Sequence, residues 1–174
     1  MEKLLKKNLI TLIKNNMHIL LTRPLEDCHK MILKFQLLGH EISHLPLISI
    51  EGLKYEPLNY LDFRGIIFTS SNAIKFLDTK NIDKNITCFC VGSATEKKAR
   101  SVGFQNVFAA DGNVDNLKEL ILLNFNPSEG SLLYVSGEII SSNLDKELIS
   151  NGYRIERVIN YRANSIEKYD EDFI

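Results

Sequence analysis

Several common protein features are missing from this sequence of 174 residues. Its formal net charge is −1, whereas a general nucleic-acid binder carries a basic surplus. Its three cysteines are too few for a disulfide framework or a four-ligand zinc site, and they favour a reducing compartment. No apolar run approaches the ~18 residues that span a membrane. We therefore expect a cytoplasmic protein with no nucleic-acid or membrane partner, in which any bound anion is held by local donors.

Common nucleotide and metal motifs are also absent or misplaced. There is no GxGxxG and no GxxxxGK[ST], so the usual nucleotide sites are unsupported. Residues 40–44 (HEISH) spell the zinc-protease pattern, which works only on a helix. Gly39 before it and Pro46 after it favour a strand, on which the two imidazoles would be ~13 Å apart. We expect no metal site, and we interpret Cys88 and Cys90, two apart on a strand, as core residues.

What the sequence does contain is a globular composition, with 44% hydrophobic and 25% charged residues. Residues 1–16 resemble a signal peptide, but their apolar stretch is shorter than the ~7–15 residues that export requires. Met17 directly precedes the first predicted strand. We expect residues 1–16 to be either an extension outside the fold or the result of a misplaced start, with Met17 as the true first residue.

Apolar runs alternate with amphipathic segments along the rest of the chain. The predicted strands are 18–22, 41–45, 65–69, 87–91, 106–109, 131–135 and 154–161, with 47–53 as an extended connector. The predicted helices are 25–38, 72–77, 95–102, 114–124 and 143–151. Such alternation predicts an α/β fold with parallel sheets covered on both faces, for which the doubly wound, flavodoxin-like class is the natural solution.

Three turns between a strand and the following helix carry small polar residues instead of acids. In an open α/β sheet, this carboxyl edge is where ligands bind, and helix N-termini with hydroxyl side chains suit carboxylate or phosphate. The alternative, that these residues are ordinary helix N-caps, is about equally supported. The residues are Thr69, Ser70, Ser71 and Asn72; Gly92, Ser93 and Thr95; and Ser136 and Gly137.

Two further side chains at strand ends are candidates for chemistry. Arg23 follows the first strand, and its guanidinium can grip a carboxylate, although a solvated arginine is the simpler interpretation. Tyr161 ends the last predicted strand, where its phenol is either an amphipathic sheet-end aromatic or a proton donor at the cleft.

Taken in order, these segments resemble the uroporphyrinogen-III synthase family. The similarity is carried by ILLTRP at 19–24, GHEISHLPLISIE at 39–51, FRGIIFTSSNAIKFL at 63–77, CVGSATEKKARSVGF at 90–104, ADGNVDNL at 110–117 and VINYRA at 158–163. Each segment alone is weak evidence, but their order and spacing are fairly specific. The family's second TS-type turn and its later glycine-threonine turn have no counterpart.

The resemblance implies two flavodoxin-like parallel-sheet domains joined by a two-stranded linker, with the first domain incomplete. The implied division is an N-terminal extension at 1–16, a partial outer domain at 17–46 and 165–174, linker strands at 47–53 and 160–164, and a complete inner domain at 54–159. The family's monomeric state is implied as well, while truncation leaves open a dimer that pairs two half-domains.

The resemblance further implies a cofactor-free lyase reaction in haem biosynthesis. Linear hydroxymethylbilane, received from hydroxymethylbilane synthase, loses water and closes to uroporphyrinogen III with inversion of its terminal ring. Tyr161 matches the family tyrosine proposed to assist loss of the hydroxyl. Substrate-binding positions carried over are Arg23, the turn of Ser70, Ser71 and Asn72 after Thr69, the turn of Gly92, Ser93 and Thr95, and the third wall at Ser136 and Gly137.

Two alternatives stay open. One is a truncated, non-catalytic remnant whose inner domain folds and retains tetrapyrrole-binding or scaffold capacity. The other is an unrelated signalling or binding module on a similar sheet, since fold alone does not fix function. The strand ends lack the acidic residues that a phosphoryl-accepting receiver module needs for Mg²⁺, which disfavours the second alternative.

Overall fold

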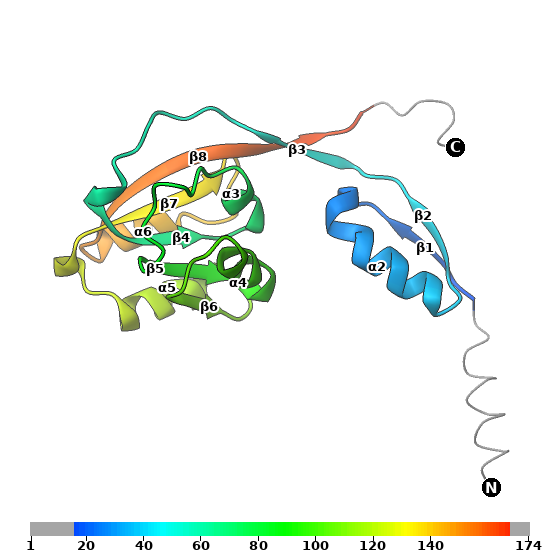
Figure 1. Cartoon of the computed structure of the whole chain (residues 1–174), viewed down its shortest axis with the longest axis horizontal. Coiled ribbons are helices and arrows are strands. Elements are labelled where there is room, and N and C mark those ends of the chain that lie inside the picture. Colours follow the sequence, from blue (N-terminus) through cyan, green and yellow to red (C-terminus); the bar gives the residue numbers. More distant parts are fainter. Residues whose placement is uncertain (1–15, 168–174) are drawn as a thin grey trace, which may run out of the picture. The chain divides into compact units, whose positions relative to one another are not determined.

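The computed structural model describes residues 16–167, so the predicted extension at 1–16 lies almost wholly outside the described residues. The chain divides into two compact units, residues 1–50 with 164–174 and residues 51–163. Figure 1 follows the chain by colour from β1 to β8. Each unit is described by itself.

The first unit is a single β-α-β element. Strands β1 (His18–Leu21) and β2 (Glu41–His44) pair in parallel, and helix α2 (Leu25–Leu37) connects them. HEISH therefore lies on a strand and its preceding turn, as the flanking Gly39 and Pro46 predicted. Gly39 has φ +84°, a left-handed conformation that lets the chain leave α2 and turn into β2.

This unit buries little apolar surface. Leu21 and Cys28 are its only buried hydrophobic residues in the part of the chain that the structure describes. Many of its large apolar side chains are exposed: Met17, Leu20, Leu25, Met31, Leu33, Leu37, Leu38, Leu47 and Ile48. A β-α-β element of this size is too small to supply a sufficient core of its own.

The second unit is built on a six-stranded sheet of order β3-β8-β7-β4-β5-β6. Its strands are β3 (Ile48–Gly52), β4 (Phe63–Phe68), β5 (Thr87–Val91), β6 (Val107–Ala110), β7 (Ser131–Gly137) and β8 (Arg154–Ser165). The pairs from β6 to β8 are parallel, which confirms the predicted α/β fold with parallel strands. Backbone hydrogen bonds join Leu53 to Asn160 and Ile166 to Leu47, so β3 and β8 run antiparallel.

The order of the parallel strands corrects one expectation. When the five parallel strands β4 to β8 are renumbered 1 to 5 along the chain, their order in the sheet is 3-2-1-4-5. The flavodoxin order is 2-1-3-4-5. The chain adds β5 and β6 on one side of β4 and then returns to place β7 on the other side. The alternation of strands and helices predicts parallel pairing but does not determine this order. The reversal creates a switch point between β4 and β7.

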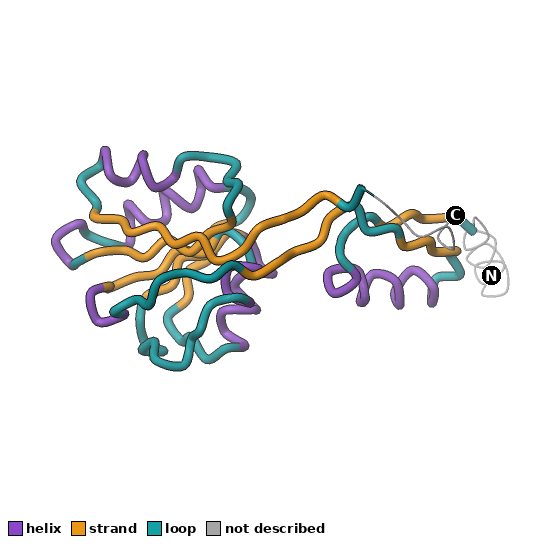
Figure 2. The backbone as a smooth tube through the Cα atoms, turned by 90° about the horizontal axis from the view of Figure 1, so that it is seen from above, coloured by secondary structure: helices purple, strands orange, loops and turns teal. Residues whose placement is uncertain are grey.

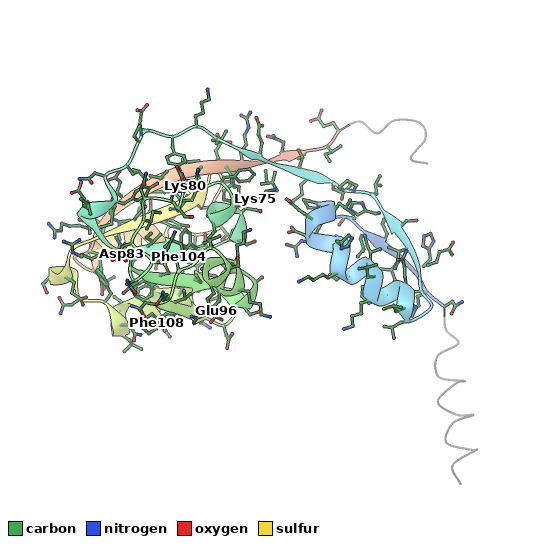
Figure 3. The ribbon with its side chains drawn as sticks, in the orientation of Figure 1. Lys75, Lys80, Asp83, Glu96, Phe104 and Phe108 are labelled. Carbon is green, nitrogen blue, oxygen red and sulfur yellow. The ribbon has the colours of Figure 1, made fainter. Side chains whose placement is uncertain are left out.

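Helices cover both faces of this sheet (Figure 2). Helices α3 (Ser71–Lys75) and α4 (Gly92–Ser101) pack over one buried cluster, and α5 (Val114–Asn124) and α6 (Leu144–Ser150) pack over the other. Phe104 belongs to the first cluster and Phe108 packs against the second, and both are labelled in Figure 3. Cys88 and Cys90 are fully buried in the first cluster, which confirms their prediction as core residues.

Several element boundaries differ from those predicted. Helix α4 starts at Gly92 instead of Thr95, because Gly92 has φ +74° and turns the chain directly from β5 into the helix. Strand β8 continues to Ser165 instead of ending at Tyr161, because β3 pairs with its second half. Two short 3-10 helices, Tyr60–Asp62 and Pro127–Glu129, precede β4 and β7. Within the described residues, no helix is long and apolar enough to cross a membrane.

Candidate functional site

A cleft of about 540 Å³ opens at the carboxyl edge of the sheet in the second unit. Its walls come from the carboxyl ends of β4, β5 and β7, from Tyr161 within β8, from the turn before α5 and from the loop after β7. This is the switch point of the strand order, where doubly wound sheets bind their ligands. The lining residues are Thr69, Ser70, Val91, Gly112, Asn113, Val114, Tyr134, Gly137, Ile139, Ile140, Ser141, Ser142 and Tyr161.

The phenol of Tyr161 lies against the backbone of Gly137. A Cβ added at Gly137 would meet the Tyr161 Cζ at 2.8 Å and its Oη at 3.0 Å. The register between β7 and β8 shifts at this point, so that Gly137 lies opposite Tyr161, and the Glu138 amide donates to the Tyr161 carbonyl at 2.9 Å. The Phe76 ring stacks on the Tyr161 ring with centroids 6.5 Å apart. Tyr161 is thus held at the cleft by a glycine that leaves room for its ring.

A second tyrosine lies deeper in the same cleft. Tyr134, on β7, is buried, and its hydroxyl lies 3.3 Å from the Thr69 hydroxyl at the end of β4. Burial raises the pKa of Tyr134, while its hydrogen bond with Thr69 opposes the shift, so its phenol stays protonated at neutral pH. Tyr134 and Thr69 link the two strands that flank the switch point.

The loop after β7 is held by Arg157 of β8. Its Nε donates to the Ser136 hydroxyl at 2.8 Å, and its Nη2 donates to the carbonyls of Gly137 and Glu138 at 2.9 and 3.2 Å. The guanidinium carbon lies 6.0 Å from the centre of the Tyr134 ring. Ser136 is buried, and its hydroxyl is committed to this network instead of facing the cleft.

The N-terminus of α5 forms another wall. The Asn113 side chain accepts hydrogen bonds from the amides of Asp115 and Asn116 at 3.0 and 3.1 Å and so caps the helix. Gly112, at φ +96°, turns the chain from β6 into this cap. The positive end of a helix dipole and its amides favour a negatively charged group.

The structure brings together some of the predicted site residues and not others. Thr69, Ser70, Gly137 and Tyr161 line the cleft, and Ser70 also caps α3 by accepting from the Asn72 amide at 3.2 Å. The remaining predicted residues of this unit do not line it. Ser71 and Asn72 lie in the first turn of α3, Gly92 and Ser93 open α4, and Thr95 is buried within α4.

Arg23 belongs to the first unit, where its guanidinium forms an exposed ion pair with Asp27 at 3.3 Å. Sequence reasoning did not pick out Tyr134, Asn113, Arg157 or the isoleucines of the loop after β7. The DGN turn at 111–113 was the one available signal, since Asp-Gly and Asn mark a tight turn into a helix cap. Among the described residues, no cluster of three or more His, Cys, Asp or Glu side chains could hold a metal ion.

Comparison with protein-family models identifies the family to which this chain is similar. The model of uroporphyrinogen-III synthase HemD matches residues 30–174 of the chain. The chain belongs to the uroporphyrinogen-III synthase family. It is also 27% identical over 164 residues to the porphyrin biosynthesis protein HemD of Ruminiclostridium josui.

Solved structures of the uroporphyrinogen-III synthase family share the fold. The uroporphyrinogen-III synthetase of Helicobacter pylori matches 75% of this chain with a TM-score of 0.56 and 24% identity. A mutant uroporphyrinogen III synthase of Thermus thermophilus matches 87% of the chain with the same TM-score and 14% identity.

This chain spans only part of these relatives. The R. josui match covers 86% of this chain but 32% of that protein. The structural matches cover 58% of the H. pylori chain and 64% of the T. thermophilus chain.

Proposed function

We propose that this chain acts as a uroporphyrinogen-III synthase, a cofactor-free lyase that converts linear hydroxymethylbilane to uroporphyrinogen III. The observation that carries this proposal is the phenol of Tyr161, seated on Gly137 at the cleft of the switch point. Family membership, which links the chain to porphyrin biosynthesis, supports it. Three free, buried cysteines favour the reducing cytosol as its compartment.

The reaction requires a proton donor and a site that holds the flexible hydroxymethylbilane in one conformation. Loss of the substrate hydroxyl as water leaves an electrophilic azafulvene, and a phenol is a suitable weak acid to assist that departure. The terminal pyrrole then attacks at its substituted carbon, and the resulting spiro intermediate fragments and recloses with that ring inverted. Tyr161 is the proposed catalytic residue, since its phenol lines the cleft.

Positioning falls to neutral hydrogen-bond donors. The cleft offers the hydroxyls of Thr69, Ser70, Ser141 and Ser142, together with the positive end of the α5 helix dipole at Asn113 and Val114. These groups suit the acetate and propionate side chains of a linear tetrapyrrole. Ser71, Asn72, Gly92, Ser93 and Thr95 stay predictions as substrate-binding residues, and so do Ser136 and Arg23. For Ser136, we propose an indirect role through Arg157.

We also propose the family's two-domain, linked architecture for the whole protein, with the first unit as the incomplete outer domain. The paired strands β3 and β8 would be the linker. The alternative function is a non-catalytic remnant in which only the second unit binds a tetrapyrrole. The small core of the first unit favours it, since Leu21 and Cys28 are the only buried apolar residues of that unit in its described part.

A coupled assay separates the two functions. Hydroxymethylbilane is generated in place by its synthase, the purified chain is added, and the type I and type III products are separated. We expect type III product above the enzyme-free blank, in which closure is unselective and gives type I. Type I product alone, from a chain shown to be folded, would contradict catalysis and favour the remnant.

A further inference from the structure

One apolar side chain stands at the mouth of the cleft almost fully in water. Ile139 is 84% exposed and lines the cleft. Among the exposed large apolar residues of residues 51–163, it is the only one that lines the cleft. Single exposed isoleucines are ordinary on protein surfaces, so its position is what carries meaning.

The loop that carries Ile139 is fixed at its base. Arg157 donates to the carbonyls of Gly137 and Glu138 at 2.9 and 3.2 Å. The Glu138 amide in turn donates to the Tyr161 carbonyl at 2.9 Å. Both backbone groups of Glu138 are therefore hydrogen-bonded to β8, the carbonyl to Arg157 and the amide to Tyr161. These bonds fix the backbone directly before Ile139.

The loop after β7 combines apolar and hydroxyl side chains, which suit the apolar face and the anionic edge of a pyrrole that carries acid groups. Ile139 and Ile140 offer apolar surface, and Ser141 and Ser142 offer hydroxyls, and all four residues line the cleft. A pyrrole ring with acid side chains has an apolar face and a polar, anionic edge. Apolar surface removed from water favours binding in proportion to its area, without direction.

We propose that the loop at 138–142 positions a pyrrole ring of the linear tetrapyrrole, with Ile139 in contact with the ring face and Arg157 as the positioning residue of the loop. This inference rests on the proposed function and deepens it. A ring held at this point lies beside Tyr161, so the contact would select which end of the substrate meets the phenol.

The test compares Ile139→Ser with a matched control, Leu123→Ser. Leu123 is 82% exposed on α5 and does not line the cleft. It is nine residues, or ~14 Å, along the helix from the cleft residue Val114. Binding of uroporphyrin III to the full chain is titrated by fluorescence anisotropy, which needs no turnover. The coupled assay then gives KM, kcat and the type III fraction.

We expect Ile139→Ser to raise the dissociation constant of uroporphyrin III about tenfold, and KM similarly, while Leu123→Ser stays within twofold of the parent chain. Ile139→Leu should restore binding. Thermal unfolding of both serine variants should match the parent, because neither side chain is buried. Equal dissociation constants for Ile139→Ser and the parent, or no binding by the parent, would overturn the inference. Binding with this pattern but without type III product would overturn the proposed function alone.

Discussion

At the scale of single residues, the phenol of Tyr161 is the group most open to a direct test. Tyr161→Phe keeps the ring against Gly137 and its stack on Phe76 but removes the proton donor. We expect kcat for type III formation to fall by about 10- to 100-fold, with KM nearly unchanged, since a positioned acid acts in the chemical step. The measurement is the coupled assay over a range of substrate concentrations.

A second tyrosine provides the control for this substitution. The Tyr60 hydroxyl donates to the Asp78 carbonyl at 3.3 Å, and Tyr60 does not line the cleft. Tyr60→Phe should cost about 1 kcal/mol of stability and leave kcat unchanged. Undiminished type III output from Tyr161→Phe would remove the catalytic role given to Tyr161.

Gly137 tests whether the place of the phenol matters as well as its presence. In Gly137→Ala, the added methyl would lie 2.8 Å from the Tyr161 Cζ, so the ring must move. We expect a loss of about 1–3 kcal/mol in the free energy of unfolding from overpacking, and a drop in kcat at least as large as in Tyr161→Phe. Full activity in a Gly137→Ala variant with a shifted melting temperature would show that ring placement is not critical.

At the scale of elements, Arg157 links strand β8 to the loop after β7. Arg157→Lys keeps the charge but cannot reach the three acceptors that the guanidinium fork serves, at Ser136, Gly137 and Glu138. We expect a destabilisation of about 2 kcal/mol by chemical denaturation, and a rise in KM greater than the fall in kcat. A purely structural role would lower stability alone, whereas a role in positioning the loop would also raise KM.

Arg100 supplies a contrasting arginine for that experiment. It also donates to backbone carbonyls, at Gln105 and Val107 by the edge strand β6, but it lies away from the cleft. Arg100→Lys should lower stability without changing KM. A KM that rises equally in both variants would contradict the assignment of Arg157 to the loop.

The elements also show what the sequence could and could not predict. The hydrophobic runs at 65–69 and 87–91 located β4 and β5, because buried parallel strands are nearly all apolar. Of the residues in the hydroxyl-bearing turn after β4, Thr69 and Ser70 lie at the carboxyl edge and line the cleft. Strand ends and turn residues are local signals, and the sequence carries them directly.

Long-range pairing is what the sequence left undetermined. Arg157 and Tyr134 carry no local sequence signal of a site, because they meet only through the pairing of β7 with β8. Thr95 was predicted as a substrate-binding residue because it lies in the turn after the strand at 87–91 and matches a threonine of the family's turn. The positive φ of Gly92 starts the helix three residues before Thr95 and buries the threonine. The strand order, too, depends on which edge each strand joins, and periodicity does not encode that choice.

At the scale of the whole molecule, the two units differ in how much core holds them together, and the cysteines report on this difference. Cys28 is fully buried in the first unit, and Cys88 and Cys90 are fully buried in the second. Burial raises the pKa of both Cys88 and Cys90, so at pH 8 their thiols stay neutral and unreactive while the unit is folded.

The free energy of the local opening that exposes a thiol should be much lower for Cys28 than for Cys88 and Cys90. The described part of the first unit buries only Leu21 and Cys28, so its opening costs little, whereas the second unit must break two extensive apolar clusters. We expect a maleimide at pH 8 to modify Cys28 within minutes and to leave Cys88 and Cys90 unmodified until denaturant unfolds the sheet. Mass spectrometry of peptides from a labelling time course measures all three rates in one sample. If Cys28 is protected from maleimide as well as Cys88 and Cys90 are, a further surface must cover the first unit. If the protection then falls with dilution, a second copy of the chain supplies that surface.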